Sequence, residues 1–147
     1  MLFRSTVELS YVGRSHSDNS LVMRFPAEGV LFAVDFIPVK SMAFRDLPDS
    51  YIGEWIDSLK AVEAMQFSVL APGHGPLGTP ADVSAFREYF EGLRDQVLAL
   101  VRQGKSLDEV KQAVDLRKYE SWAGYKDMGP LNVEGMYKYM QTNRRPN

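Results

Sequence analysis

The sequence contains no cysteine and only two histidines among its 147 residues. The absence of cysteine excludes disulfides, thiolate nucleophiles, zinc sites built on thiolates and iron–sulfur clusters. No apolar run approaches the roughly 20 residues that a membrane-spanning helix needs, and residues 1–6 lack the pattern of a signal peptide. We therefore expect a soluble protein, with the cytoplasm as its default location and no membrane partner.

The sequence also lacks an excess of basic residues. Its 17 lysines and arginines are set against 19 acidic residues, which gives a formal net charge of −2. This balance argues against nucleic acid as a partner, because nucleic-acid binding depends on neutralising phosphates. Hydrophobic residues make up 45% of the chain, enough to build a core, and the length predicts one domain over residues 1–147.

The N-terminal third has the pattern of a small β-sheet. Residues 7–12 alternate between apolar and polar side chains, which is typical of a half-buried strand. Residues 20–25 and 30–34 read as two strands of a hairpin joined by a tight turn at 26–29. The second of these is a continuous apolar run, so we expect it to be buried on both faces of the sheet.

The remaining two thirds are mainly helical by pattern. Apolar residues at helical spacing predict a helix over about residues 50–65, and residues 67–70 read as a short strand. A second helix is expected from an N-cap at Thr79 to Gly104, and a capping box at Ser106 starts a short third one. The last thirty residues predict a loop and a terminal helix packed on the body, with residues 144–147 frayed.

Three side chains are candidate metal ligands, because histidine and carboxylate are common zinc donors. His16 lies in a polar loop over residues 13–19, Asp35 follows the buried strand at 30–34, and His74 lies between two glycines. Three such residues meeting at one sheet edge suit a hydrolytic metal site, in which the metal activates water and polarises the scissile group.

Each candidate also has a simpler interpretation. His16 alone is more often a hydrogen-bonded surface residue than a ligand, and Asp35 can cap a turn or pair with Lys40 or Arg45. The glycines beside His74 favour a role, since they allow the backbone to approach a ligand closely. These alternatives stay open on the residues alone.

Taken in order, the motifs resemble the C-terminal half of the metallo-β-lactamase superfamily. The matching segments are Gly13-Arg14-Ser15-His16-Ser17-Asp18-Asn19, Gly29-Val30-Leu31-Phe32-Ala33-Val34-Asp35 and Ala71-Pro72-Gly73-His74-Gly75-Pro76. The resemblance implies that His16 and His74 are zinc ligands and that Asp35 bridges two metals. It covers about residues 7–103, which leaves residues 104–147 as a helical extension.

The resemblance also identifies what this chain lacks. The family's H-x-H-x-D-H loop, which supplies most of the metal ligands, is absent, and the chain has no third histidine. The family fold is an αββα sandwich of two similar halves, so we expect half of it: an α/β fold whose mixed sheet is covered by helices on one face. The uncovered face predicts a homodimer or other homo-oligomer in which one copy covers another.

Two functions follow from this resemblance. In the first, the chain is a fragment or reduced relative of a metal-dependent hydrolase, with a weak or incomplete zinc site, that is not active alone. If a partner completes it, the resemblance implies hydrolysis of a small molecule by a metal-bound hydroxide. Residues 36–47 and the aromatic residues Tyr119, Trp122 and Tyr125 could line a pocket, but core packing explains them as well and is favoured for the aromatic residues. In the second, it is a non-catalytic half-fold that acts as a structural or interaction module, or a truncated reading frame.

Overall fold

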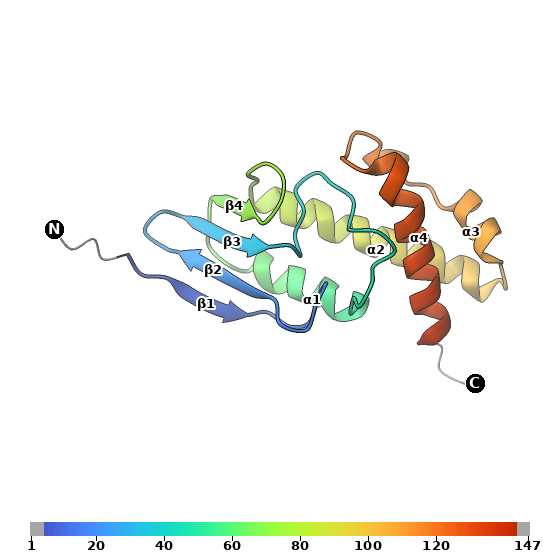
Figure 1. Ribbon diagram of the computed structural model, residues 1–147, viewed down its shortest axis with the longest axis horizontal. Coiled ribbons are helices and arrows are strands. Elements are labelled where there is room, and N and C mark those ends of the chain that lie inside the picture. The colour runs from blue at the N-terminus through green and yellow to red at the C-terminus, as the bar shows by residue number, and fades with distance from the viewer. Residues whose placement is uncertain (1–4, 144–147) are drawn as a thin grey trace.

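The computed structural model describes residues 5–143 and contains one mixed β-sheet and a set of helices (Figure 1). The strands run in the order β1-β2-β3-β4 across the sheet, and they are β1 Glu8–Tyr11, β2 Leu21–Phe25, β3 Val30–Val34 and β4 Val69–Pro72. The helices are α1 Ile52–Glu63, α2 Pro80–Arg102, α3 Leu107–Ala113, the 3₁₀ turn η1 Arg117–Tyr119 and α4 Tyr125–Thr142. The expectations for residues 1–4 and 144–147 lie outside the described residues.

Strand pairing makes the sheet mixed, as expected. The pairs β1–β2 and β2–β3 are antiparallel, whereas β3–β4 is parallel, so the chain crosses over through α1 between β3 and β4. The two parallel strands therefore end at the same edge of the sheet.

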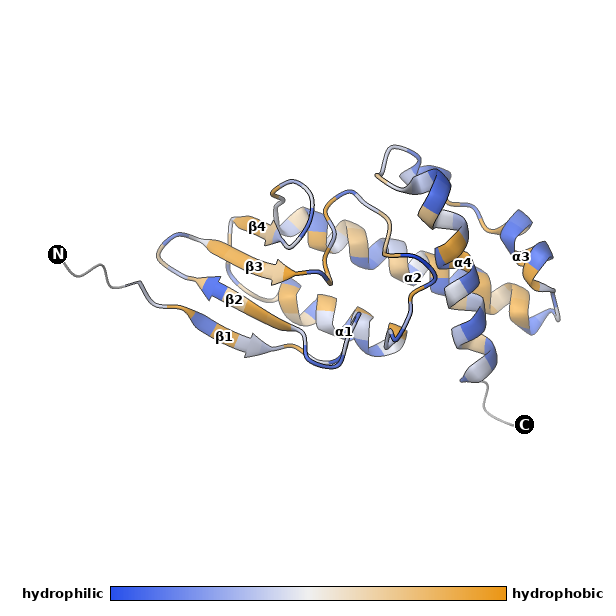
Figure 2. Cartoon of the chain, viewed as in Figure 1, coloured by the Kyte–Doolittle hydropathy of each residue, from blue (hydrophilic) through white to orange (hydrophobic). Residues whose placement is uncertain are grey.

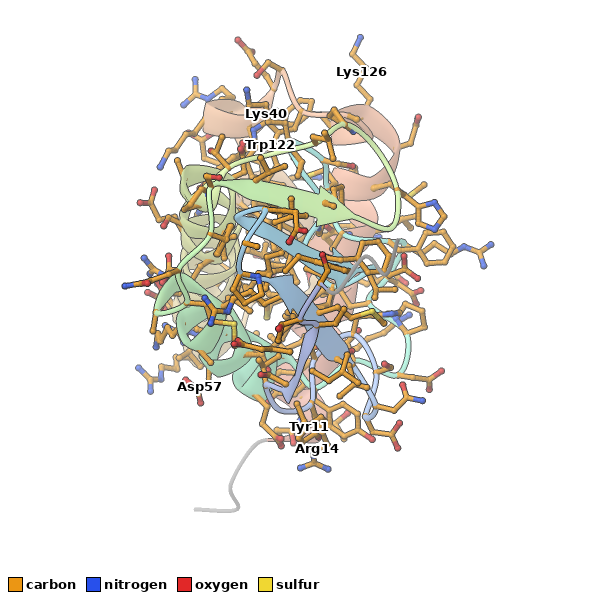
Figure 3. All side chains as sticks on the ribbon, turned by 90° about the vertical axis from the view of Figure 1, so that its left-hand side faces the viewer. Tyr11, Arg14, Lys40, Asp57, Trp122 and Lys126 are labelled. Atoms are coloured by element: carbon orange, nitrogen blue, oxygen red, sulfur yellow. The ribbon has the colours of Figure 1, made fainter. Side chains whose placement is uncertain are left out.

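One face of the sheet is buried against the helices. Side chains alternate between faces along a strand, and Val22, Leu31, Ala33 and Leu70 are all fully buried. They belong to the same core as apolar residues of α1 and α2, and Figure 3 shows these two helices on one side of the strands. The expected α/β architecture, with helices covering one face, is confirmed.

The other face of the sheet is apolar and open. Its side chains lie in register across the strands, and β2 and β3 are hydrophobic along most of their length (Figure 2). In β1 and β2, Leu9 is 63% exposed, Tyr11 57% and Leu21 38%. The expectation that residues 30–34 are buried on both faces was wrong, because β3 alternates between buried and half-buried residues. None of the described helices covers its second face.

An aromatic cluster joins α2 to the C-terminal segment. Tyr89 of α2 packs edge-on against Tyr119, with ring centroids 5.0 Å apart, and its ring lies 5.7 Å from that of Trp122. Tyr119 thus belongs to the core, and Trp122 and Tyr125 pack against it. Core packing, the favoured of the two interpretations of these aromatic residues, is what the structure shows. Among residues 5–143, no helix has the length and hydrophobicity needed to cross a bilayer.

Candidate metal-site pocket

The loop that carries His16 is fixed to the start of α1. The backbone N–H of Tyr51 donates to the Ser15 carbonyl at 2.8 Å, and the buried Ser15 hydroxyl donates to Ser20 Oγ at 2.9 Å. The His16 ring is half-buried, and its centroid lies 6.1 Å from that of Trp55. This loop therefore holds His16 against the body of the protein.

An ion pair strengthens the same attachment. Arg14 Nε donates to Glu54 Oε2 at 2.8 Å, and its guanidinium lies 4.3 Å from the centre of the Tyr51 ring. The hydrogen bond from Arg14 lowers the pKa of Glu54, so this carboxyl stays ionised. Ser58 Oγ of α1 donates to the Arg14 carbonyl at 3.1 Å, which ties the backbone of the loop to the helix as well.

Asp35 and His74 lie next to each other where β3 and β4 end. The Gly73 N–H donates to the Val34 carbonyl at 2.5 Å, and His74 Nε2 lies 3.4 Å from Asp35 Oδ1. A Cβ atom on Gly73 would overlap Asp35 Oδ1 and lie 3.1 Å from the Val34 carbonyl carbon. The glycine before His74 is thus required for the close approach of the two segments, whereas the sequence had suggested a close approach of the backbone to a ligand.

The backbone just before Asp35 is in an uncommon conformation. Val34 has φ of 46°, in the left-handed region that β-branched residues rarely enter, and the register shifts between Phe32 and Val34. This irregularity turns the chain out of the sheet at Asp35, whose carboxylate is 40% exposed. The polar neighbour of the Asp35 carboxylate is the His74 imidazole, and no ion pair within residues 5–143 joins Asp35 to Lys40 or Arg45.

All three predicted side chains line one cavity of about 590 Å³. Most of its wall is apolar, and the polar groups are few. Its lining residues are His16, Val34, Asp35, Pro38, Ser41, Met42, Ala43, Phe44, Pro48, Ser50, Trp55, Pro72, His74, Gly124 and Met128. Both interpretations of residues 36–47 hold in part, because Pro38 and residues 41–44 line the cavity whereas Phe36, Ile37, Val39 and Leu47 are buried in the core. The C-terminal segment contributes Gly124 and Met128 to the lining.

A buried asparagine in α4, which the sequence did not reveal, holds this wall in place. Asn132 is fully buried, accepts hydrogen bonds from the Ala43 N–H at 3.1 Å and the Tyr89 hydroxyl at 2.7 Å, and donates to the Ala43 and Arg45 carbonyls at 3.0 and 2.6 Å. Nearby, the Met42 N–H donates to the Ala123 carbonyl at 3.0 Å. A single asparagine within an amphipathic helix carries no signal of this role in the sequence.

The donors do not form a complete metal site. Asp35 and His74 are adjacent, whereas His16 lies elsewhere on the cavity wall. Within the part of the chain that the structure describes, no three His, Asp or Glu side chains gather closely enough to hold a metal ion. A zinc ion needs about three protein ligands, so these residues alone do not fit it.

Comparisons with known proteins support the fold. No protein-family model matches the chain, and no curated protein matches it. Solved structures, in contrast, do match the chain. VMB-1 matches with a TM-score of 0.51 and 21% identity, over 61% of this chain and 45% of its own.

Two metallo-β-lactamases give similar values. The enzyme from Pontibacter korlensis matches with a TM-score of 0.52 and 21% identity, over 59% of this chain and 42% of its own. The DIM-1 metallo-β-lactamase matches with a TM-score of 0.50 and 24% identity, over 58% and 40%. The matched region thus spans less than half the length of these structures, and over about 60% of this chain it shows part of the metallo-β-lactamase fold.

Proposed function

We propose that this chain is a fragment or reduced relative of a metallo-β-lactamase-like metal-dependent hydrolase, and that it supplies an incomplete set of zinc ligands, His16, Asp35 and His74. One observation carries the proposal: three segments far apart in the sequence bring these side chains to one cavity of about 590 Å³. Because the set is incomplete, we expect no hydrolysis by the isolated single chain.

The cavity suits this role in its accessibility and its lining. The side chain of His74 is 89% exposed and that of Asp35 40%, so both can be reached from solvent. A complete zinc site activates water and polarises the scissile bond of a substrate. The apolar wall around Met42, Phe44 and Trp55 would meanwhile hold the apolar part of a small-molecule substrate.

Zinc titration tests the ligand assignment. The purified protein and the variants His74→Ala and Asp35→Asn would be titrated with zinc in competition with a coloured chelator. We expect each variant to lower zinc affinity about tenfold or more, since even the loss of a residue that only supports a ligand costs this much. Asp57→Asn is the matched control, because Asp57 is an exposed carboxylate of α1 outside this cavity.

A second function is favoured by the lack of a complete donor group among the described residues. In this alternative, the chain is a non-catalytic half-fold that acts through its open sheet face as a structural or interaction module. The same titration separates the two functions. If zinc does not bind, or binds equally well to the unmodified protein and to His74→Ala, metal binding at this site is refuted and the non-catalytic module is the function that remains.

A further inference from the structure

We propose that the cavity beside Asp35 selects organic ammonium ions, in which a protonated amine is attached to an aromatic or other apolar group. The inference deepens the proposed function, on which it rests for the use of this cavity as a ligand site, because it names the class of molecule that the cavity takes. It is carried by the charges and hydrogen-bonding groups of the lining, independently of zinc.

Asp35 gives the cavity a negative charge that no lining residue neutralises. The described residues that line the cavity include no lysine, no arginine and no second carboxylate, and histidine is counted as neutral at pH 7. No salt bridge within residues 5–143 joins the Asp35 carboxylate to a lysine or an arginine. The Arg45 guanidinium lies 5.4 Å from the centre of the Phe44 ring, but Arg45 is outside the lining. The cavity should therefore attract a cation and repel an anion.

The polar side chains of the lining offer a ligand more acceptors than donors. The hydroxyls of Ser41 and Ser50 each donate to a backbone carbonyl at 3.2 Å, and the Trp55 indole N–H donates to another at 2.8 Å. These three groups have their protons in use, whereas the two serine oxygens and the Asp35 carboxylate can still accept. The two imidazoles, when neutral, add one donor and one acceptor each. An ammonium group, with three N–H donors and no acceptor, is the complement of such a lining.

The rest of the lining suits the apolar part of such a molecule. Met42, Trp55 and Met128 contribute apolar wall, and Phe44 adds an exposed aromatic ring. Because the indole N–H of Trp55 is already bonded, its ring presents a purely apolar surface, and aromatic faces also attract cations. A cavity of about 590 Å³ lies within the range of small-molecule sites, so an amine on a short phenylalkyl group fits both its size and its chemistry.

Three ligands of nearly equal size and different charge test the proposal. They are phenethylamine, phenethyl alcohol and phenylacetate, each titrated at pH 8, where an ordinary imidazole is uncharged, and with EDTA present to remove divalent metals. The chain has two tryptophans, so isotope-labelled protein gives two indole N–H signals in NMR spectra. Trp55 lines the cavity and reports binding, whereas Trp122 lies outside the lining and is the internal control. Trp122→Phe assigns the two signals.

Two variants separate the charge of the cavity from its apolar contacts. Asp35→Asn keeps the shape of the side chain and removes its charge. Phe44→Ala removes an aromatic ring that is 67% exposed, so the truncation should cost little stability. Their matched controls are Asp57→Asn, at an exposed carboxylate of α1, and Leu77→Ala, at a side chain that is 70% exposed, both outside the lining.

We expect the amine to bind the unmodified protein about fivefold or more tightly than the alcohol, and phenylacetate to bind most weakly, since a charge-assisted hydrogen bond keeps part of its strength at a partly exposed carboxylate. In Asp35→Asn the amine and the alcohol should bind about equally. In Phe44→Ala both should bind more weakly, with their ratio unchanged, and the two controls should match the unmodified protein.

The comparison of ligands on the unmodified protein is decisive even if a variant fails to fold. Equal affinity for the amine and the alcohol, tighter binding of phenylacetate, or no shift of the Trp55 signal with any ligand would overturn the proposal. Because EDTA is present, the result is independent of the zinc titration. Loss of amine selectivity leaves the assignment of the zinc ligands standing, and absence of zinc binding leaves amine selectivity standing.

Discussion

Replacing Asn132 with alanine should destabilise the protein and loosen the cavity wall. The side chain is fully buried and makes four hydrogen bonds, so truncation leaves the Ala43 N–H, the Ala43 and Arg45 carbonyls and the Tyr89 hydroxyl without that partner. Burial raises the pKa of Tyr89, so this hydroxyl stays protonated and still needs an acceptor. No other side chain described in the structure connects α4 to both residues of the wall.

The expected loss can be worked from these contacts. Each buried polar group left without a partner costs about 1–3 kcal/mol, with water or small shifts recovering part of the sum. We therefore expect the free energy of unfolding to fall by about 3–5 kcal/mol. This is a large share of the 5–15 kcal/mol typical of a folded domain, and each 1.4 kcal/mol of it raises the unfolding equilibrium constant roughly tenfold.

Urea denaturation followed by tryptophan fluorescence and by circular dichroism measures this change. Asn143→Ala is the control, since Asn143 is an exposed asparagine that follows the same helix and bonds only to the Tyr139 carbonyl. We expect it to change stability by less than about 0.5 kcal/mol. A loss below about 1 kcal/mol in Asn132→Ala would refute the view that this residue supports the wall.

Two further changes test the site and the helical layer. Gly73→Ala places a Cβ against Asp35, so it should lower the free energy of unfolding by about 1–3 kcal/mol. Gly92→Ala, with open space around its Cβ in α2, should raise the same free energy by about 0.5–1 kcal/mol. Equal effects of the two variants in urea denaturation would contradict the close approach at Asp35. Hydrogen bonds from lysines, of which that of Lys111 has the largest effect, lower the pKa of Glu134 from 4.5 to about 2. The ionised carboxylate therefore stabilises the folded state above pH 4.5, and this stabilisation is lost as the pH falls to 2. Over this pH range, the midpoint temperature of thermal unfolding should drop less steeply in Glu134→Gln than in the unmodified protein. An equally steep drop in the two proteins would contradict this role of Glu134.

Local patterns in the sequence predicted most of the secondary structure. The strand at 30–34 matches β3, and the signals at Thr79 and Ser106 mark the starts of α2 and α3, where Asp82 and Glu109 accept hydrogen bonds from the capping residues. These predictions succeed because capping and periodicity depend on residues close together in the chain. The predicted strand at 67–70 lies instead at Val69–Pro72, because its position is set by parallel pairing with β3.

The site was predictable as a set of residues but not as a geometry. His16, Asp35 and His74 were found by their types and contexts, yet their convergence depends on the parallel pairing of β3 with β4, which joins segments about forty residues apart. The backbone path of the wall between Asp35 and α1 was beyond prediction, since Lys40 and Arg45 take left-handed backbone conformations for which their side chains give no signal.

The cavity therefore depends on two parts of the chain with different roles. The sheet positions Asp35 and His74 through backbone contacts at Val34 and Gly73. The C-terminal segment instead holds the opposite wall, through Asn132 and the Ala123 backbone. Changes in α4 should thus alter how well an apolar ligand fits without moving the two adjacent donors, whereas changes at the strand ends should separate the donors and leave the apolar wall intact.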